Sequence, residues 1–219
     1  MFRSVITLLL ACFAGSLAHA ALVSQDSAFG ANTITLDTDT GLEWLDWDLT
    51  IGLSFDEVVA ELAAGGAYEG FRFATNDEVG TLWINAGIID IVTEGPVDVP
   101  NDFARVNFLP ARDLIELLGF TGLGGNLAEA TTADPGNQAG TQTVAELQLC
   151  VGGPCVAAGA LRNSALASLG PNDQPADEGR SIIGAALVRD TAVVPVPGAL
   201  WLALSGLLVV SRFRANRRA

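Results

Sequence analysis

Three segments of the chain repeat apolar residues at the three- and four-residue spacing of an amphipathic helix. In the first, residues 54–65, Ser54 and Glu57 have the spacing of a capping box, which marks a helix N-terminus. Gly65 is expected to end this helix. The apolar positions of its predicted buried face are Phe55, Val58, Val59 and Leu62.

The second and third segments follow the same logic. Thr75 and Glu78 form another capping box at the start of "TNDEVGTLWINAG". The apolar face of that helix consists of Val79, Leu82, Trp83 and Ala86, so Trp83 is expected to be largely buried. A third helix is predicted from Pro110 to Leu118, in "PARDLIELLG".

Stretches with the two-residue period of a strand lie before and after these helices. "TITL" and "GLEWLDW" are predicted strands joined by the turn "DTDTG" (37–41). If the second strand runs through residue 47, Leu42, Trp44 and Asp46 share one face and Glu43, Leu45 and Trp47 the other. Trp44 is then a core residue. "TVAELQLC", "CVAAGAL" and "SIIGAALVR" predict later strands.

Two polar stretches rich in Gly and Pro, residues 131–142 and 169–180, are predicted to be surface loops. Helices near the front and strands behind them predict one compact α+β domain over residues 21–190.

The N-terminus has the pattern of a secretory signal peptide over residues 1–20. One arginine precedes a short apolar run, and Ala18 and Ala20 form the small-x-small site that signal peptidase cleaves. The alternative is a lipoprotein processing box in "LLAC" at 9–12, but the apolar run continues past Cys12. Either way, the domain is expected to be exported.

The C-terminal segment, residues 191–219, has the pattern of a membrane anchor. No charge occurs from residue 191 to 211, and a short apolar span over residues 199–210 follows Pro195 and Pro197. The arginines after the span are expected to stay cytoplasmic, which puts the domain outside the membrane. The span positions singled out are Ala199, Leu200, Trp201, Leu202, Ser205, Gly206, Leu207, Leu208, Val209 and Val210, and the stop is Arg212, Arg214, Arg217 and Arg218.

This tail resembles the PEP-CTERM sorting signal of Gram-negative bacteria, in the form with Val-Pro-x-Pro, "LWL", "SGLL" and a basic end. The motif positions are Val194, Pro195, Val196 and Pro197, and Val196 replaces the acidic residue that names the motif. The resemblance implies recognition by an exosortase-like transpeptidase, which would cut near the prolines and move the protein to the cell surface or extracellular matrix. The alternative is a plain tail anchor.

The charge of the chain excludes one class of partner. The formal net charge is −14, and all 25 acidic residues lie between Asp26 and Asp190. Such a surface repels phosphate backbones, so nucleic acid is not an expected partner. It suits solubility outside the cell, or loose association with divalent cations.

Export also determines how the cysteines are interpreted. Removal of the signal peptide takes Cys12 away and leaves Cys150 and Cys155, which flank a Gly-Pro turn in "CVGGPC". In an oxidising compartment two such thiols are expected to pair, here across the neck of a hairpin. The alternative is a reactive or metal-binding thiol pair, although no histidine is left to complete a ligand set.

The mature chain lacks the residue types of most active sites. The single histidine, His19, lies in the signal peptide and the chain has no lysine, which excludes Ser-His-Asp and Cys-His catalysis, Schiff bases and P-loops. A carboxylate cluster beside two tryptophans could bind or cleave a glycan; its members are Glu43, Asp46, Asp48, Trp44 and Trp47. Asp37 and Asp39 have the spacing of a calcium loop, but no glutamate closes it, so a turn is expected instead.

The front half carries a second resemblance. "TGLEWLDW", then a helix, then "GFRFATNDEV" is similar to the pattern of Lcl-type bacterial surface domains over residues 40–87, and "GAALVRD" (184–190) resembles their closing strand. Phe73 and Ala74 stand where that pattern has Leu-Pro. The resemblance implies a compact fold like that of C-type lectins and a role in the cell envelope, not a reaction.

Together these patterns predict a non-enzymatic surface or matrix protein that is anchored by its tail, needs no cofactor or resident metal, and associates with exopolysaccharide. The first alternative is a carbohydrate-binding module that stays in the inner membrane. The second is a carboxylate-based glycan hydrolase with its carboxylates in the cluster around Asp46.

Overall fold

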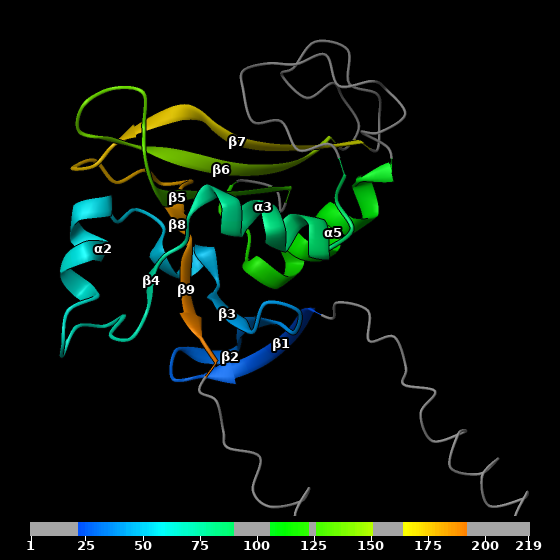
Figure 1. Cartoon of the computed structure of the whole chain (residues 1–219), viewed down its shortest axis with the longest axis horizontal. Coiled ribbons are helices and arrows are strands. Elements are labelled where there is room, and N and C mark those ends of the chain that lie inside the picture. The colour runs from blue at the N-terminus through cyan, green and yellow to red at the C-terminus, as the bar shows by residue number, and fades with distance from the viewer. Residues whose placement is uncertain (1–21, 90–105, 123–125, 151–163, 192–219) are drawn as a thin grey trace, which may run out of the picture.

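The computed structural model describes residues 22–89, 106–122, 126–150 and 164–191, and these form an α+β fold of one antiparallel and one mixed sheet with helices between and beside them (Figure 1). The predicted fold class is therefore confirmed at this level. The predicted signal peptide and sorting tail, with Trp201, lie outside the described residues. Within those residues, no helix is long and apolar enough to cross a membrane.

The first sheet, sheet A, has the strand order β1-β2-β3-β9-β4. Its strands are β1 (Leu22–Ser27), β2 (Gly30–Asp37), β3 (Leu42–Leu45), β9 (Leu187–Asp190) and β4 (Arg72–Phe73). The predicted "DTDTG" turn joins β2 to β3, and Gly41 in this turn has φ +71°, which favours glycine. β9, the last strand along the chain, lies inside the sheet between β3 and β4.

The predicted capping boxes both form. α2 (Phe55–Glu61) begins at Ser54 and α3 (Asn76–Asn85) at Thr75, and in each helix the Ser or Thr and the Glu bond each other's backbone N–H. These interactions depend on residues three apart, so local sequence predicts them well. The prediction that Val59 lies on the buried face is wrong, because Val59 is 45% exposed. α2 is only two turns long and buries Val58 against sheet A, which turns the next residue towards solvent.

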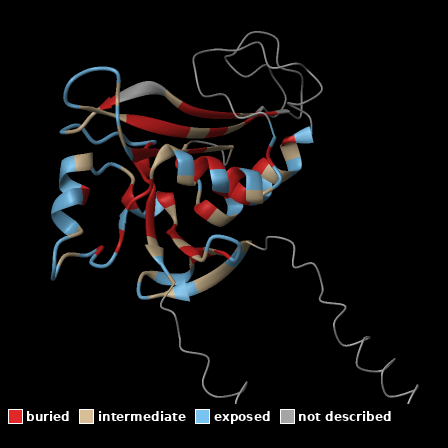
Figure 2. Cartoon of the chain, viewed as in Figure 1, coloured by how far each residue is buried: buried red, intermediate tan, exposed pale blue. Residues whose placement is uncertain are grey.

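The third predicted helix is α5 (Phe108–Leu118), which starts two residues earlier than expected. Its buried positions are Ala111, Leu114, Ile115 and Leu118. α3 and α5 cover the same face of the second sheet, and the buried residues in Figure 2 are concentrated where these helices meet the strands.

The second sheet, sheet B, has the order β7-β6-β5-β8. Its strands are β7 (Ser164–Pro175), β6 (Thr141–Cys150), β5 (Leu127–Pro135) and β8 (Gly184–Ala185). Residues 131–135 belong to β5, 141–142 to β6 and 169–175 to β7, so the loops predicted at 131–142 and 169–180 are wrong for these parts. Residues 136–140 and 176–180 lie outside the strands and are mostly exposed, as predicted. The polar residues of these strands are tolerated because they form hydrogen bonds with Asn76. Thr132 and Thr143 donate to Asn76 Oδ1, and the Asp134 carboxylate accepts from the Asn76 N–H.

The strand partner predicted for the cysteine hairpin was also wrong. β6 pairs with β7, in which Ser164 is opposite Cys150, and with β5 on its other edge. Both edges of β6 are therefore occupied by β5 and β7, and the predicted strand "CVAAGAL" (155–161) lies outside the described residues. Cys155 lies outside the described residues, so the Cys150–Cys155 bridge stays a prediction.

A single predicted strand, residues 181–189, is divided between the two sheets. β8 pairs with β5 in sheet B, whereas β9 pairs with β3 and β4 in sheet A. Residues 184–188 are all buried, because a segment that crosses from one sheet to the other has neighbours on every side. A uniformly apolar run does not reveal such a crossing.

The main core combines large and small side chains. Trp44, Trp47 and Trp83 are all 0% exposed, which confirms the prediction for Trp44 and Trp83. Sheet B contributes both small and large residues to this core: Ala128, Ala130, Ala145, Ala165 and Ala167, and Leu147, Leu149 and Leu169. A smaller core on the other face of sheet A packs Phe71, Phe73 and Tyr68 beneath α2. The indoles and the side chains of sheet B together fill the volume between the two sheets.

Candidate functional site

The carboxylate–tryptophan cluster predicted from sequence is not assembled as a binding surface. β3 ends at Leu45 and a four-residue 3₁₀-helix, η1 (Trp47–Thr50), follows, so the strand alternation stops before Trp47. Trp47 turns into the core beside Trp44 instead of sharing a face with Glu43, which corrects the prediction. Neither indole is accessible, and neither can stack on a sugar ring.

Glu43 is taken up by an ion pair within sheet A. Arg189 Nε donates to Glu43 Oε2 over 2.6 Å, joining β9 to β3 at a pair of directly opposed residues. The Arg189 guanidinium also lies 4.6 Å from the centre of the Phe71 ring. Both contacts stabilise the position of β9. Glu43 therefore has a structural role in sheet A.

Asp46 and Asp48 form a pair of interacting carboxyls around η1. Asp46 precedes η1 without bonding its N-terminus, and its Oδ1 is buried without a hydrogen-bond partner. Burial, and then the charge of Asp48, raise the pKa of Asp46 to about 7. Burial also raises the pKa of Asp48, against the lowering effect of bonds from the backbone N–H groups of Asp48 and Leu49.

Asp48 also fills the space beside the C-terminal end of α5. A Cβ built on Gly119, which follows that helix at φ +82°, would lie 2.5 Å from Asp48 Cγ. Glycine is therefore required at this position by both conformation and space. The last turn of α5 contains no basic residue, so the helix end provides no cation for the carboxylate.

A second carboxyl pair was missed by sequence analysis. Glu129 on β5 and Glu146 on β6 are directly opposite each other, on the face of sheet B turned away from α3 and α5. Burial, and then the charge of Glu146, raise the pKa of Glu129 to about 7, although Arg180 acts to lower it. Burial raises the pKa of Glu146 as well. Glu129 Oε2 is buried without a partner.

A signal for this second pair exists in the sequence. Each glutamate lies in a short alternating stretch, "LAEA" or "VAEL", where its neighbours are core residues. The alternation places both glutamates on one face only if the two stretches pair in register, and that register is set by the whole hairpin. Asp46 and Glu129, each with a pKa raised to about 7, can take up and release a proton near neutral pH, and this is the chemistry that the two pairs offer.

The acidic turn at residues 37–41 has the geometry of a turn and not of a cation loop. The Asp37 side chain is buried, and its Oδ1 accepts from the Asp39 N–H over 3.0 Å and from the Thr40 N–H over 3.4 Å. Its Oδ2 accepts from Asn85 Nδ2 over 2.8 Å. In the described part of the chain, no group of three or more His, Cys, Asp or Glu side chains could hold a metal ion.

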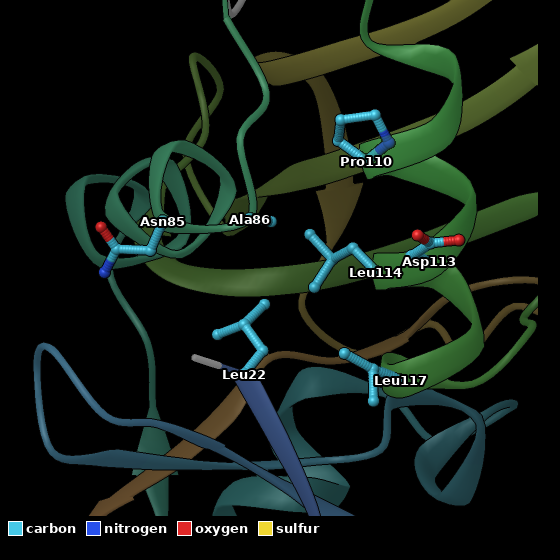
Figure 3. A pocket seen from close by; sticks show the side chains of 7 residues that line it. All are labelled: Leu22, Asn85, Ala86, Pro110, Asp113, Leu114 and Leu117. Carbon is cyan, nitrogen blue, oxygen red and sulfur yellow. The ribbon is translucent and has the colours of Figure 1, made fainter. Parts of the chain in front are cut away.

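A small pocket lies between α3, α5 and the start of β1 (Figure 3). It has a volume of about 190 Å³, and its lining is Leu22, Asn85, Ala86, Pro110, Asp113, Leu114 and Leu117. The Asn85 amide already donates to Asp37, and Asp113 accepts from the Arg112 guanidinium. The pocket therefore offers an apolar hollow for a small group and no set of converging polar side chains.

No protein-family model matches this sequence, and neither the curated proteins nor the solved structures contain a match. The function is therefore argued from the residues and the fold.

Proposed function

We propose that this protein is an exported, non-enzymatic protein of the cell surface or extracellular matrix. It is made with a signal peptide, is held in the inner membrane by its C-terminal tail, and is then processed near Pro195 and Pro197 by an exosortase-like transpeptidase. Exopolysaccharide is the partner that we propose for the acidic domain, and a fold like that of C-type lectins is part of the same proposal.

The observation that carries this proposal is the position of the two ends of the described fold. Leu22 is opposite Asp37, Asp37 is opposite Leu42, and Leu42 is opposite Asp190. The start of β1 and the end of β9 therefore lie on one row of paired residues across sheet A, with β2 and β3 between them. Three strand spacings of about 4.8 Å separate the two ends by roughly 15 Å. The Thr191 N–H continues this edge by donating to the Gly41 carbonyl over 3.0 Å.

A domain with both ends on one edge suits a precursor whose two ends are in the same membrane. The signal peptide precedes Leu22 and the apolar tail follows Thr191, so the whole α+β fold forms on one side of the bilayer. Two ends on opposite sides of the domain would need long linkers to reach the same membrane surface.

Two further features support the non-enzymatic and lectin-like parts of the proposal. The indoles predicted to flank a glycan are buried, and Glu43 is held in an ion pair. In addition, residues 40–87 and 184–190, the two stretches that resemble Lcl-type domains, are neighbours in sheet A, where β9 pairs with both β3 and β4.

The experiment is fractionation of cells that produce the chain with an epitope at each end of residues 21–219. Deletion of residues 200–210 is expected to release the domain into the periplasm, because the apolar span is lost. Changing Pro195 and Pro197 to Ala is expected to trap the full-length form in the inner membrane, since the neck can then continue the helix. Val193→Ala, next to the prolines, is the matched control and should be processed normally.

Loss of the C-terminal epitope from surface protein, together with retention of the proline variant, would support sorting. A proline variant that reaches the surface with its C-terminal epitope attached would contradict sorting and favour the plain anchor. Purified domain should also bind exopolysaccharide from the same cells without releasing reducing ends; turnover would instead favour the hydrolase.

A further inference from the structure

We propose that residues 184–191 are a mechanical clamp that resists force applied to the domain through its C-terminal tail. The biological meaning of the clamp rests on the proposed tethering, but the clamp itself is a property of the fold. It follows from the observation that this segment crosses both sheets, and from its position directly before the proposed tether.

The clamp segment is bonded to parts of the fold that are far apart in sequence. In sheet B, Gly184 and Ala185 pair with Ala130 and Thr131 of β5. Between the sheets, the Ala185 N–H donates to Thr50 Oγ1 over 2.7 Å, and the Ala186 carbonyl accepts from the Ala74 N–H over 2.7 Å.

In sheet A the same segment has strands on both sides. Val188 is opposite Trp44 of β3 and also opposite Arg72 of β4. Arg189 adds its ion pair with Glu43 and its contact with the Phe71 ring. The Thr191 N–H makes the last bond, to Gly41, directly before the tail. A pull on the tail therefore meets bonds from several parts of the fold at once.

The direction of the pull determines how these bonds are loaded. The hydrogen bonds of antiparallel strands are perpendicular to the strands, so a force along β9 loads all of its bonds together in shear. A force across the strands loads only the outermost rung and breaks the rungs one after another. Figure 1 shows β9 running from the middle of the molecule to its lower end, while the β5–β6 turn lies at the upper left.

Two pulling directions on the same protein therefore differ. A force between the tail and the β5–β6 turn has a large component along β9 and loads the clamp in shear. A force between the tail and the N-terminus acts across the rung that joins Leu22 to Asp190, and it peels the edge strand β1 from β2. The first direction corresponds to a tethered protein that binds a ligand on its far side.

The experiment is single-molecule force spectroscopy on the full chain in detergent, held by its C-terminal end. The second handle is either the N-terminal end or a peptide tag inserted between Gln138 and Ala139, both exposed in the β5–β6 turn. At equal force, the unfolding lifetime is expected to be at least about tenfold longer with the handle in the turn, because forced unfolding follows the unfolding rate.

A variant tests whether β9 is responsible. Arg189→Met removes the ion pair and the contact of the cation with Phe71, and it should shorten the lifetime roughly fivefold with the handle in the turn, but not with the N-terminal handle. Arg112→Met is the matched control: it removes a 2.6 Å ion pair with Asp113 on α5, away from β9, and should change neither lifetime.

Equal lifetimes in the two directions, or an Arg189→Met effect of the same size in both, would overturn the clamp. Neither result bears on processing of the tail, which is measured in cells. Conversely, a tail that is never processed leaves the difference between the two directions intact, so the two proposals fail separately.

Discussion

Raising the pH from 5 to 8 should destabilise this domain, because two half-buried carboxyls bind protons more tightly in the folded state. Burial, followed by a neighbouring carboxylate, raises the pKa of Asp46 from 3.8 and that of Glu129 from 4.5, each to about 7. Between the unfolded and folded pKa values the folded state holds a proton that the unfolded state has lost. The contribution of these two groups to stability is therefore fully present below about pH 4 and is lost as the pH rises through about 7.

The magnitude follows from these pKa values. At 1.36 kcal/mol for each pH unit, the upper limits are about 4 kcal/mol for Asp46 and about 3 kcal/mol for Glu129. Both side chains keep contact with solvent, which screens the charge, so we expect roughly 1 to 2 kcal/mol from each. Two such groups change the free energy of unfolding by a large share of what a domain of this size has.

The assay is guanidinium chloride denaturation at pH 5, 6, 7 and 8. The wild type should lose roughly 1 to 3 kcal/mol across this range, because part of the total loss already occurs below pH 5. Asp46→Asn and Glu129→Gln should each be more stable than the wild type at pH 8 and similar to it at pH 5, because the neutral amide needs no proton. Asp39→Asn, in an exposed turn, is the control and should keep the wild-type pH dependence. A wild type whose stability rises from pH 5 to 8 would refute this reasoning, as would unchanged pH dependence in both variants.

Substitutions at three sites, each with a comparison variant, test the packing and the helix ends by denaturation. Trp83→Phe should lower the free energy of unfolding by about 1 kcal/mol or less, because it removes a buried indole N–H that has no hydrogen-bond partner. Trp83→Ala should lower it by about 3 to 5 kcal/mol. Equal losses would contradict the unpaired indole N–H. Gly119→Ala should lower the free energy of unfolding by about 1 to 3 kcal/mol, and adding Asp48→Ala to the same chain should restore part of this loss. If Gly119→Ala left the stability unchanged, the close contact with Asp48 would be rejected. Thr75→Ala should cost about 1 kcal/mol and the exposed Thr81→Ala much less; the reverse order would reject the capping box.

The helices were predictable because their signals are local. Both capping boxes join residues three apart, and the Val79, Leu82 and Trp83 stripe buries its face wherever the helix packs. Val59 failed for a reason that sequence does not contain: only contact with sheet A determines which part of α2 is covered, and that part is narrow.

Sheet B was harder to predict because its strands carry polar residues that usually mark loops. Thr132 and Thr143 are tolerated in the interior because Asn76, from a distant helix, accepts their hydroxyls. That partner cannot be recognised before the fold is known. The Glu129–Glu146 pair could not be predicted for the same reason, because these residues are opposite each other only in one register of β5 and β6.

The carboxyl pairs and the shared edge of the two ends have one consequence if the domain is exported as we propose. Its stability is then expected to change with the pH outside the cytoplasm. Asp46 lies next to η1, and the Thr50 hydroxyl of η1 accepts the Ala185 N–H at the start of the clamp segment. We therefore expect the charge that Asp46 gains beside Asp48 to weaken the joint between η1 and the clamp segment. Under the proposed tethering, the lifetime of the domain under a pull on its tail should be longer at pH 5 than at pH 8, and the same lifetime at both pH values would contradict this link.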